Sequence, residues 1–202
     1  FFLIPYNLLM YGVNDVFDYP SDFRNPRKGG IEGGLLEPKF HRPTLLISFG
    51  LALPFVVYLL VVGSIVSGLV LLAVLFLVIA YSLGGLRFKE IPFLDSFTSA
   101  MHFVGPMLFA LSLTNTQFDL RLWLITASFT LWGMASHAFG AVQDIRADRE
   151  AGIASIATVL GAKATVRIAF FMYLLAGVMT LFLGDRYPQA ALAALPYLFV
   201  VG

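Results

Sequence analysis

The chain has 202 residues, of which 59% are hydrophobic and 12% are charged, and its formal net charge is +1. Soluble domains contain about 45–50% apolar and about 25% charged residues, so this composition excludes a soluble globular domain and indicates a polytopic membrane protein. The small net charge argues against a nucleic acid partner, and the absence of cysteine excludes disulfides, thiolate nucleophiles and cysteine-based metal sites.

Apolar segments with few charges follow one another along the chain, separated by glycine, proline and charged residues. The segments cover residues 1–13, 45–62, 65–82, 93–113, 121–143, 165–183 and 189–202. The complete segments have about 18 to 23 residues, close to the roughly 20 that a helix needs to cross a bilayer. We therefore predict an all-α, polytopic transmembrane helical bundle that forms a single domain over residues 1–202. The end segments are short and the chain starts with Phe1, so we expect a fragment that is truncated at both ends.

The lysines and arginines are distributed unevenly between the loops. When successive loops are assigned alternately to the two membrane faces, eleven of the 13 basic residues fall on one face. Such an excess marks the cytoplasmic side of a membrane protein. Most acidic residues fall in the same loops, so we expect the polar entrance of a site on the cytoplasmic face. The apolar segments are expected to contact the lipid bilayer.

The first acidic cluster directly follows the first apolar segment. On a helix, Asn14, Asp18 and Asp22 recur every four residues and form one stripe, with Asp15 on the neighbouring flank. Pro20 weakens the case for a continuous helix, because proline lacks a backbone donor and can bend the chain before Asp22. A stripe of carboxylate and amide oxygens can hold a cation.

The second acidic cluster follows the fifth apolar segment, where Asp144 and Asp148 stand one helical turn apart. Four helix passes separate the two clusters, so both lie at the same membrane face. Carboxylates that face each other repel unless a cation neutralises them, and Mg²⁺ prefers oxygen ligands that it often shares with substrate phosphates. The paired clusters predict Mg²⁺ that bridges to a diphosphate; the alternative interpretation is a solvated rim of helix ends.

Basic loops adjoin both clusters and contain possible phosphate ligands. Arg27 and Lys28 follow the first cluster, and Arg87 and Lys89 follow the third apolar segment. Arginine binds phosphate oxygens in a bidentate manner, whereas lysine acts as a mobile point charge. The alternative for each residue is an anchor at anionic lipid headgroups.

Ionisable residues inside the apolar segments are few. Asp95 stands at the entrance of the fourth segment, where it is either a functional group or the partner of Arg87 or Lys89. His102 and His137 show no spacing typical of a zinc site, so we interpret them as buried histidines with satisfied hydrogen bonds.

The two clusters carry a resemblance to a known family. Residues 14–22 read Asn-Asp-x-x-Asp-x-x-x-Asp, and residues 144–148 read Asp-x-x-x-Asp. With these motifs the sequence resembles the UbiA superfamily of intramembrane prenyltransferases, and the similarity extends to residues 81–89 and 152–161. Further stretches, such as residues 25–33 and 132–136, look like those of the lycopene elongases, a branch that prenylates an acyclic carotenoid.

The resemblance implies a fold of nine transmembrane helices around a central cavity, of which this chain contains about seven. It implies a Mg²⁺-dependent transferase, in the plasma membrane of a prokaryote, that moves a prenyl group from dimethylallyl diphosphate to lycopene. The implied metal ligands are Asn14, Asp15, Asp18, Asp22, Asp144 and Asp148. The implied diphosphate ligands are Lys28, Arg87, Lys89, Tyr81 and Arg27. The implied catalytic residues are Asp18, Asp144 and Asp148.

Other functions remain open at this point. An aromatic acceptor, such as a quinone precursor or a tetrapyrrole, is possible within the same family. A cation-coupled transporter is a further alternative, although it predicts charges at mid-membrane depth, whereas these charges lie at segment ends. A lipid-headgroup phosphotransferase lacks its Asp-Gly and Ala-Arg signature here.

Overall fold

The computed structural model describes residues 1–25, 28–30, 33–183 and 189–202, which form helices and contain no β-strand. The α-helices are α1 (Pro5–Asp22), α2 (His41–Val62), α3 (Ile65–Ser82), α4 (Leu94–Leu113), α5 (Leu120–Ala141), α6 (Ile145–Ala151), α7 (Ile156–Leu160), α8 (Ala162–Leu181), α9 (Gln189–Leu192) and α10 (Leu195–Val201). Short 3₁₀ helices are η1 (Pro38–Phe40), η2 (Phe88–Glu90) and η3 (Val142–Asp144).

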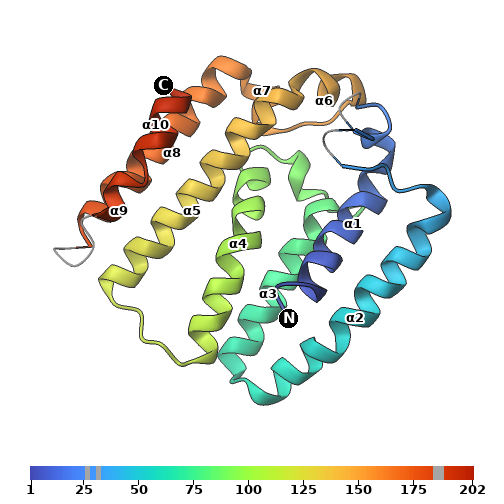
Figure 1. Ribbon diagram of the computed structural model, residues 1–202, viewed down its shortest axis with the longest axis horizontal. Coiled ribbons are helices and arrows are strands. Elements are labelled where there is room, and N and C mark those ends of the chain that lie inside the picture. Colours follow the sequence, from blue (N-terminus) through green and yellow to red (C-terminus); the bar gives the residue numbers. More distant parts are fainter. Residues whose placement is uncertain (26–27, 31–32, 184–188) are drawn as a thin grey trace.

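The long helices pack side by side in an order that differs from the chain order. Helix α2 packs on α1, α1 packs on α3, and the row continues through α4 and α5 to α8 and α10 (Figure 1). The C-terminal ends of α1, α3 and α5 lie at one end of the bundle along the helix axes, together with the start of α4. Helices α6 and α7 lie at that same end, which we call the polar end. The structure thus brings the two acidic clusters to one end of the bundle.

The helices agree with most of the predicted apolar segments. Among the described residues, four helices are long and apolar enough to cross a membrane: α2 extended by η1, α3, α4 and α8. The bounds of α5 lie within two residues of the predicted segment 121–143. Pro54 and Pro106 lie inside α2 and α4, which continue through them.

The end segments differ from their predicted bounds. The first lies in α1, which begins at Pro5 and, as the helical stripe of the first acidic cluster predicts, runs through Pro20 to Asp22. The last segment, predicted as one helix over 189–202, contains the short helices α9 and α10. Pro196 lies in the first turn of α10, where its missing N–H costs no helical hydrogen bond.

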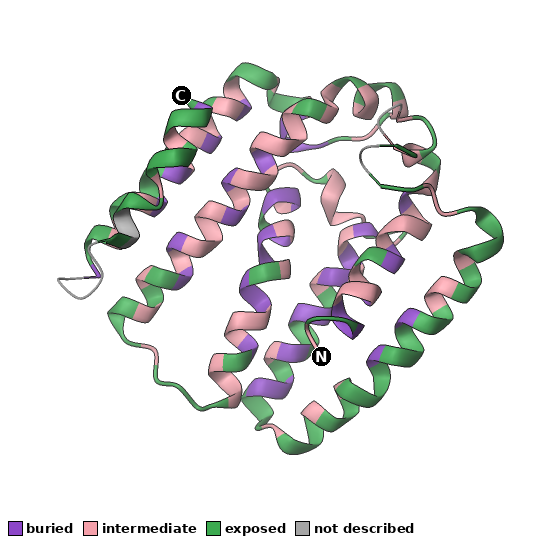
Figure 2. Cartoon of the chain, in the orientation of Figure 1, coloured by how far each residue is buried: buried purple, intermediate pink, exposed green. Residues whose placement is uncertain are grey.

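The outer faces of the helices carry many exposed residues (Figure 2). Large hydrophobic side chains point outward on several helices, including Val61 at 77% exposure, Ile65 at 85% and Phe199 at 90%. A surface of this kind is unfavourable in water and is typical of contact with lipid. The composition, the four candidate spans and this surface identify an integral membrane protein.

Small residues let neighbouring helices approach closely. A Cβ atom at Gly133 of α5 would lie 2.9 Å from Cβ of Ala100 on α4, and one at Gly105 of α4 would lie 2.7 Å from Val74. Hydroxyl groups add hydrogen bonds between helices, since Ser128 Oγ donates to the carbonyl of Ala176 at 2.8 Å. Close packing of small residues, together with such bonds, is the usual basis of helix association in membranes.

Candidate active site

A cavity of about 360 Å³ lies at the polar end, between α1, α3, α5 and α6. Eight residues that the sequence singles out line it: Asn14, Asp18, Asp22, Lys28, Tyr81, Lys89, Asp144 and Asp148. Asp15 and Arg87 are not among the lining residues, although both belong to segments that border the cavity. Arg27 lies outside the described residues.

Helix α1 supplies the first acidic stripe as an unbroken helix. Pro20 is exposed and α1 continues to Asp22, so Asn14, Asp18 and Asp22 keep their four-residue spacing. All three side chains line the cavity, whereas the half-buried Asp15 lies on the flank. The stripe therefore faces the cavity as the helical spacing requires.

The second acidic pair is held differently from the prediction. Helix α5 ends at Ala141, one residue after Gly140, whose helix propensity is low. Asp144 then ends the 3₁₀ turn η3, and Asp148 lies in the first turn of α6. Both carboxylates still line the cavity, so the pair is presented by a turn and a short helix, where the prediction has one continuous helix. Asn25 Nδ2 lies 3.5 Å from Asp144 Oδ1 and links the two clusters across 119 positions of sequence.

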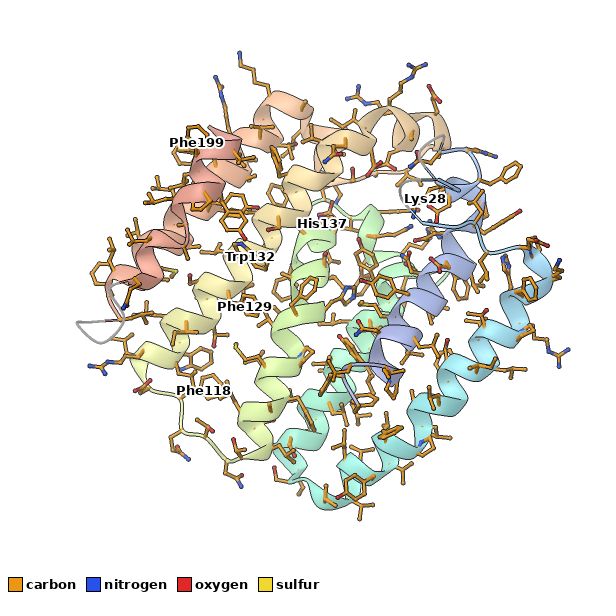
Figure 3. The ribbon with its side chains drawn as sticks, in the orientation of Figure 1. Lys28, Phe118, Phe129, Trp132, His137 and Phe199 are labelled. Carbon is orange, nitrogen blue, oxygen red and sulfur yellow. The ribbon has the colours of Figure 1, made fainter. Side chains whose placement is uncertain are left out.

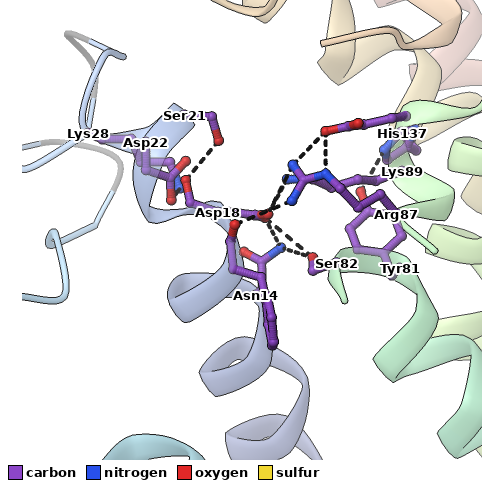
Figure 4. A network of polar contacts seen from close by, with 12 residues as sticks. Asn14, Asp18, Ser21, Asp22, Lys28, Tyr81, Ser82, Arg87, Lys89 and His137 are labelled. Atoms are coloured by element: carbon purple, nitrogen blue, oxygen red, sulfur yellow. Dashed lines mark hydrogen bonds and ion pairs between the residues drawn. The ribbon is translucent and has the colours of Figure 1, made fainter. Parts of the chain in front are cut away.

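Asp18 is the most buried carboxylate of the first cluster, with 3% exposure, and cations and amides surround it (Figure 4). Lys89 forms an ion pair with its Oδ1, and Arg87 Nη2 lies 3.9 Å from the same oxygen. Asn14 Nδ2 donates to Oδ2 at 2.5 Å and also to Ser82 Oγ at 2.9 Å. Burial of a carboxylate requires such compensation.

Arg87 supports this arrangement from outside the cavity. It adopts the left-handed conformation, with φ 43° and ψ 54°, which is costly for a residue with a Cβ atom. In this conformation its guanidinium donates to the carbonyl of Phe17 at 3.3 Å and to Glu90 Oε1 at 2.5 Å. Arg87 thus joins the loop after α3 to the acidic helix α1.

Lys28 neutralises the outer end of the stripe. Its Nζ lies 3.4 Å from Asp22 Oδ2, and the two side chains are 27% and 19% exposed. Figure 3 shows Lys28 on the polar end of the bundle, near the end of α1. Two lysines from different segments, Lys28 and Lys89, therefore pair with two of the three carboxylates of α1.

The oxygen donors of the cavity suit a hard divalent cation by their chemistry. Carboxylate and amide oxygens are the ligands of Mg²⁺, which usually binds one or two carboxylates and keeps several waters. In the described part of the chain, no three histidine, aspartate or glutamate side chains cluster closely enough to form a complete protein-only metal site. Asp18 and Asp22 instead contact lysines, so the donor set fits a metal that shares its coordination with water and an anionic ligand.

Negative charge accumulates on the α6 side of the cavity. The pKa of Asp148 is raised to about 6, first because burial disfavours its charged form and then because Asp144 is close. Lys89 and a hydrogen bond from Ser155 act in the opposite direction. The two carboxylates repel each other, and a cation between them would relieve the repulsion.

A polar path that the sequence did not reveal leaves the cavity through Tyr81. Tyr81 Oη lies 3.1 Å from His137 Nε2, and His137 Nδ1 lies 3.2 Å from Ser96 Oγ. Ser96 donates to Asp95 Oδ1 from both its backbone nitrogen and its hydroxyl. The spacing of 41 positions between Ser96 and His137 leaves no local pattern in the sequence, so only the packing of α4 against α5 shows this contact.

Asp95 is held by backbone nitrogens and by the hydroxyl of Ser96. The sequence suggested Arg87 or Lys89 as its partner, but these two residues pair with Asp18 and Glu90. The Oδ2 atom of Asp95 accepts from the backbone nitrogen of Ile156 at 2.7 Å, and the side chain is fully buried at the start of α4. Asp95 thereby holds the start of α7 against α4 within the described region.

Comparison with known proteins gives a consistent result over the whole chain. Residues 1–202 match the UbiA prenyltransferase family. The chain is 54% identical over 203 residues to a protein from Dietzia sp. named C(50) beta-cyclic carotenoids biosynthesis protein LbtBC. The aligned region covers all of this chain and 47% of that protein. The chain is 49% identical over 199 residues to the lycopene elongase/hydratase of Corynebacterium glutamicum, covering 98% of this chain and 69% of the relative.

More distant relatives are also named lycopene elongase/hydratase. The lycopene elongase/hydratase of Haloarcula japonica is 34% identical over 177 residues, covering 87% of this chain and 58% of the relative. No solved structure matches the chain significantly. The chain spans about half to two thirds of the length of these relatives.

Proposed function

The chain belongs to the UbiA prenyltransferase family, and from this we propose that the protein moves a prenyl group from its diphosphate to lycopene. The donor is dimethylallyl diphosphate, and the product is a longer carotenoid. The names of the relatives support lycopene over an aromatic acceptor such as a quinone precursor or a tetrapyrrole. Because the chain spans only part of the length of those relatives, the activity is proposed for the whole protein, and we propose that residues 1–202 form one transmembrane domain.

The observation that carries the proposal is the convergence of two distant acidic clusters and two lysines on one cavity. An isolated helix end with aspartates would be a solvated rim, whereas here Asp18 is buried at 3% exposure. Carboxylates that are buried beside lysines form a site for a ligand that carries both metal and phosphate charge. A transporter is less consistent with this arrangement, because the charges gather at one end of the bundle.

Each group in the cavity has a part in the proposed reaction. The oxygens that would hold Mg²⁺ belong to Asn14, Asp15, Asp18, Asp22, Asp144 and Asp148. Bound there, Mg²⁺ would neutralise the diphosphate and so promote its departure from the allylic carbon. The residues that would bind the diphosphate oxygens are Lys28, Lys89, Tyr81, Arg27 and Arg87, of which Arg87 acts mainly by holding Asp18 in place.

The apolar part of the bundle completes the mechanism. Departure of the diphosphate leaves an allylic cation, which an electron-rich double bond of the acceptor attacks. Water would quench this cation, so the lipid-facing and apolar surroundings protect it. Asp18, Asp144 and Asp148 are the proposed catalytic residues because their fixed charges act on the leaving group.

We also propose an orientation for the site. The basic residues of the sequence crowd into the loops at the polar end, so this end faces the cytoplasm. The relatives come from prokaryotes, and this supports a location in the plasma membrane.

The experiment uses membranes that contain the full-length protein, incubated with dimethylallyl diphosphate and lycopene, with either Mg²⁺ or EDTA. We expect a prenylated carotenoid by mass spectrometry with Mg²⁺ and none with EDTA. Asp144→Asn should lower turnover at least about a hundredfold, in line with removal of one element of electrostatic catalysis.

The matched control is Glu150→Gln, which neutralises an exposed carboxylate of α6, the short helix that follows Asp144, outside the cavity lining. It should keep the activity of the unaltered protein. Prenylated product in the presence of EDTA would refute the role of Mg²⁺. Full activity of Asp144→Asn would support the alternative that the aspartates are only solvated helix ends. Transfer to an aromatic acceptor in preference to lycopene would refute the acceptor.

A further inference from the structure

A chain of hydrogen bonds leads from the cavity into the interior of the bundle. It begins at Tyr81 on α3, passes through His137 on α5 and Ser96 on α4, and ends at Asp95 (Figure 4 shows its first members). Tyr81 and His137 line the cavity, whereas Ser96 and Asp95 are fully buried. Three helices are needed to assemble it, and no local motif of the sequence contains it.

The bonds fix the direction in which protons are donated. Asp95 accepts at both oxygens, so the hydroxyl of Ser96 donates to it and offers a lone pair to His137. His137 then carries its proton on Nδ1 and donates to Ser96, which leaves Nε2 as the acceptor for the hydroxyl of Tyr81. The oxygen lone pairs of Tyr81 are thus available toward the cavity, and a vacant proton site stands behind it on His137.

We propose that Tyr81 and His137 together remove the proton that ends the prenyl transfer; this inference rests on the proposed function. Attack by a double bond of the acceptor forms the new carbon–carbon bond and leaves a tertiary carbocation. A C–H bond next to the cationic carbon breaks, and its electron pair forms the new double bond. The proton goes to Tyr81 Oη, while the original proton of Tyr81 passes to His137 Nε2, so charge and atoms balance.

The relay ends on a carboxylate that faces the positive charge which His137 acquires. Asp95 is connected to His137 Nδ1 through the hydroxyl of Ser96. The imidazolium is therefore stabilised by the carboxylate of Asp95. The His102 ring packs edge-on against Tyr81, with 5.1 Å between the ring centroids.

Two carboxylates of the cavity are less suited to accept this proton because they are already paired. Asp18 and Asp22 contact Lys89 and Lys28, and the proposed metal would withdraw electron density from their oxygens. The rival base is an oxygen of the departed diphosphate. The relay and the diphosphate make different predictions for variants of Tyr81 and His137, because a substitution of either side chain leaves the diphosphate in place.

The test uses the full-length protein in liposomes with dimethylallyl diphosphate and lycopene. The variants are Tyr81→Phe, His137→Gln, the double variant and Ser96→Ala, and the control is His102→Gln. Two quantities are measured: the KM for dimethylallyl diphosphate with diphosphate release, and the ratio of hydroxylated to alkene product. Water captures a cation that loses no proton, so this ratio reports deprotonation directly.

We expect Tyr81→Phe and His137→Gln each to raise the hydroxylated-to-alkene ratio at least about tenfold, a modest share of what general base catalysis supplies. The KM of His137→Gln should stay within about twofold, because His137 is not one of the proposed diphosphate ligands. Tyr81→Phe also removes one such ligand, so its KM should rise together with the ratio. The double variant should have the same hydroxylated-to-alkene ratio as each single variant, because the two substitutions interrupt the same path. Ser96→Ala should raise this ratio by a smaller factor. His102→Gln should keep the ratio of the unaltered protein.

An unchanged ratio in Tyr81→Phe, which is isosteric and keeps the packing, would overturn the proposal in favour of the diphosphate. A KM raised tenfold with an unchanged ratio would show that Tyr81 and His137 bind the diphosphate instead. Additive effects in the double variant would refute a shared path. If the unaltered protein forms no prenylated carotenoid, the proposed function itself fails, and this outcome is distinct from the others. Should His137→Gln misfold, Tyr81→Phe and Ser96→Ala still decide the matter.

Discussion

Replacement of Lys89 by methionine removes the ammonium group that pairs with the buried carboxylate of Asp18. The Lys89 side chain is 14% exposed and the Asp18 side chain is 4% exposed, so water has little access to the pair. Methionine keeps the length of the apolar stem and deletes only the charge. The carboxylate then stays in a buried position with fewer compensating groups.

The size of the effect follows from the groups that remain. Removal of one partner from a buried ion pair costs about 3–5 kcal/mol. Arg87 stays 3.9 Å from Asp18, and Asn14 continues to donate to its other oxygen, so part of the compensation persists. We therefore expect a loss of about 2–3 kcal/mol, which corresponds to a melting temperature lower by about 5–10 °C in a domain of this size.

The assay is thermal unfolding in detergent with EDTA, followed by circular dichroism at 222 nm. The matched control is Lys39→Met, because Lys39 pairs with Glu37 while both side chains are more than 60% exposed. An exposed pair contributes about 0–1 kcal/mol, so the control should shift the melting temperature by less than about 3 °C. If Lys89→Met melts at the same temperature as the control, the reasoning about burial of Asp18 is refuted.

Three further outcomes are expected from the same unfolding assay in EDTA. The pKa of Asp148 is raised to about 6, above its unfolded value, so the folded state binds the proton more tightly and loses this advantage as the pH rises through 6. Asp148→Asn should therefore be more stable than the unaltered protein at pH 8, with the difference shrinking toward pH 4; equal melting temperatures at pH 8 would contradict the shifted pKa. Asp95→Ala should destabilise the fold by about 3 kcal/mol, because buried backbone donors lose a charged acceptor, and a loss below about 1 kcal/mol would count against that role. Gly133→Ala should cost about 1–3 kcal/mol through the close contact with Ala100, whereas Gly50→Ala, where a Cβ meets no atom within 4 Å, should be neutral or stabilising; the reverse order would refute the packing argument.

The sequence predicted the central helices well because their limits are set locally. The predicted segment 65–82 has the same bounds as α3, which begins after Ser64, whose side chain accepts from the backbone nitrogen of Ser67. A capping residue next to an unbroken apolar run leaves little choice of boundary. By contrast, the chain over 189–202 contains a break that hydropathy does not detect, since residues on both sides of it are apolar.

The candidate site was predictable in its residue types and in its place at one membrane face. Helical spacing put Asn14, Asp18 and Asp22 on one stripe, and the parity of the spans brought Asp144 to the same end. The partners of these groups were not predictable, because they depend on which helices become neighbours. Asp95 is an example, since its contact with the backbone of Ile156 crosses 61 positions of sequence.

The contact between Asn25 and Asp144 also bears on how the protein is made. These residues are 119 positions apart, so ribosomes that add 5–20 residues per second need about 6–24 s between them. During this interval the first acidic stripe is already synthesised, and its opposite wall does not yet exist. Under the proposed function, a nascent chain cannot ionise a prenyl diphosphate before α5 and α6 have been inserted beside α1. The proposed carbocation would then arise only after the helices that shield it have assembled.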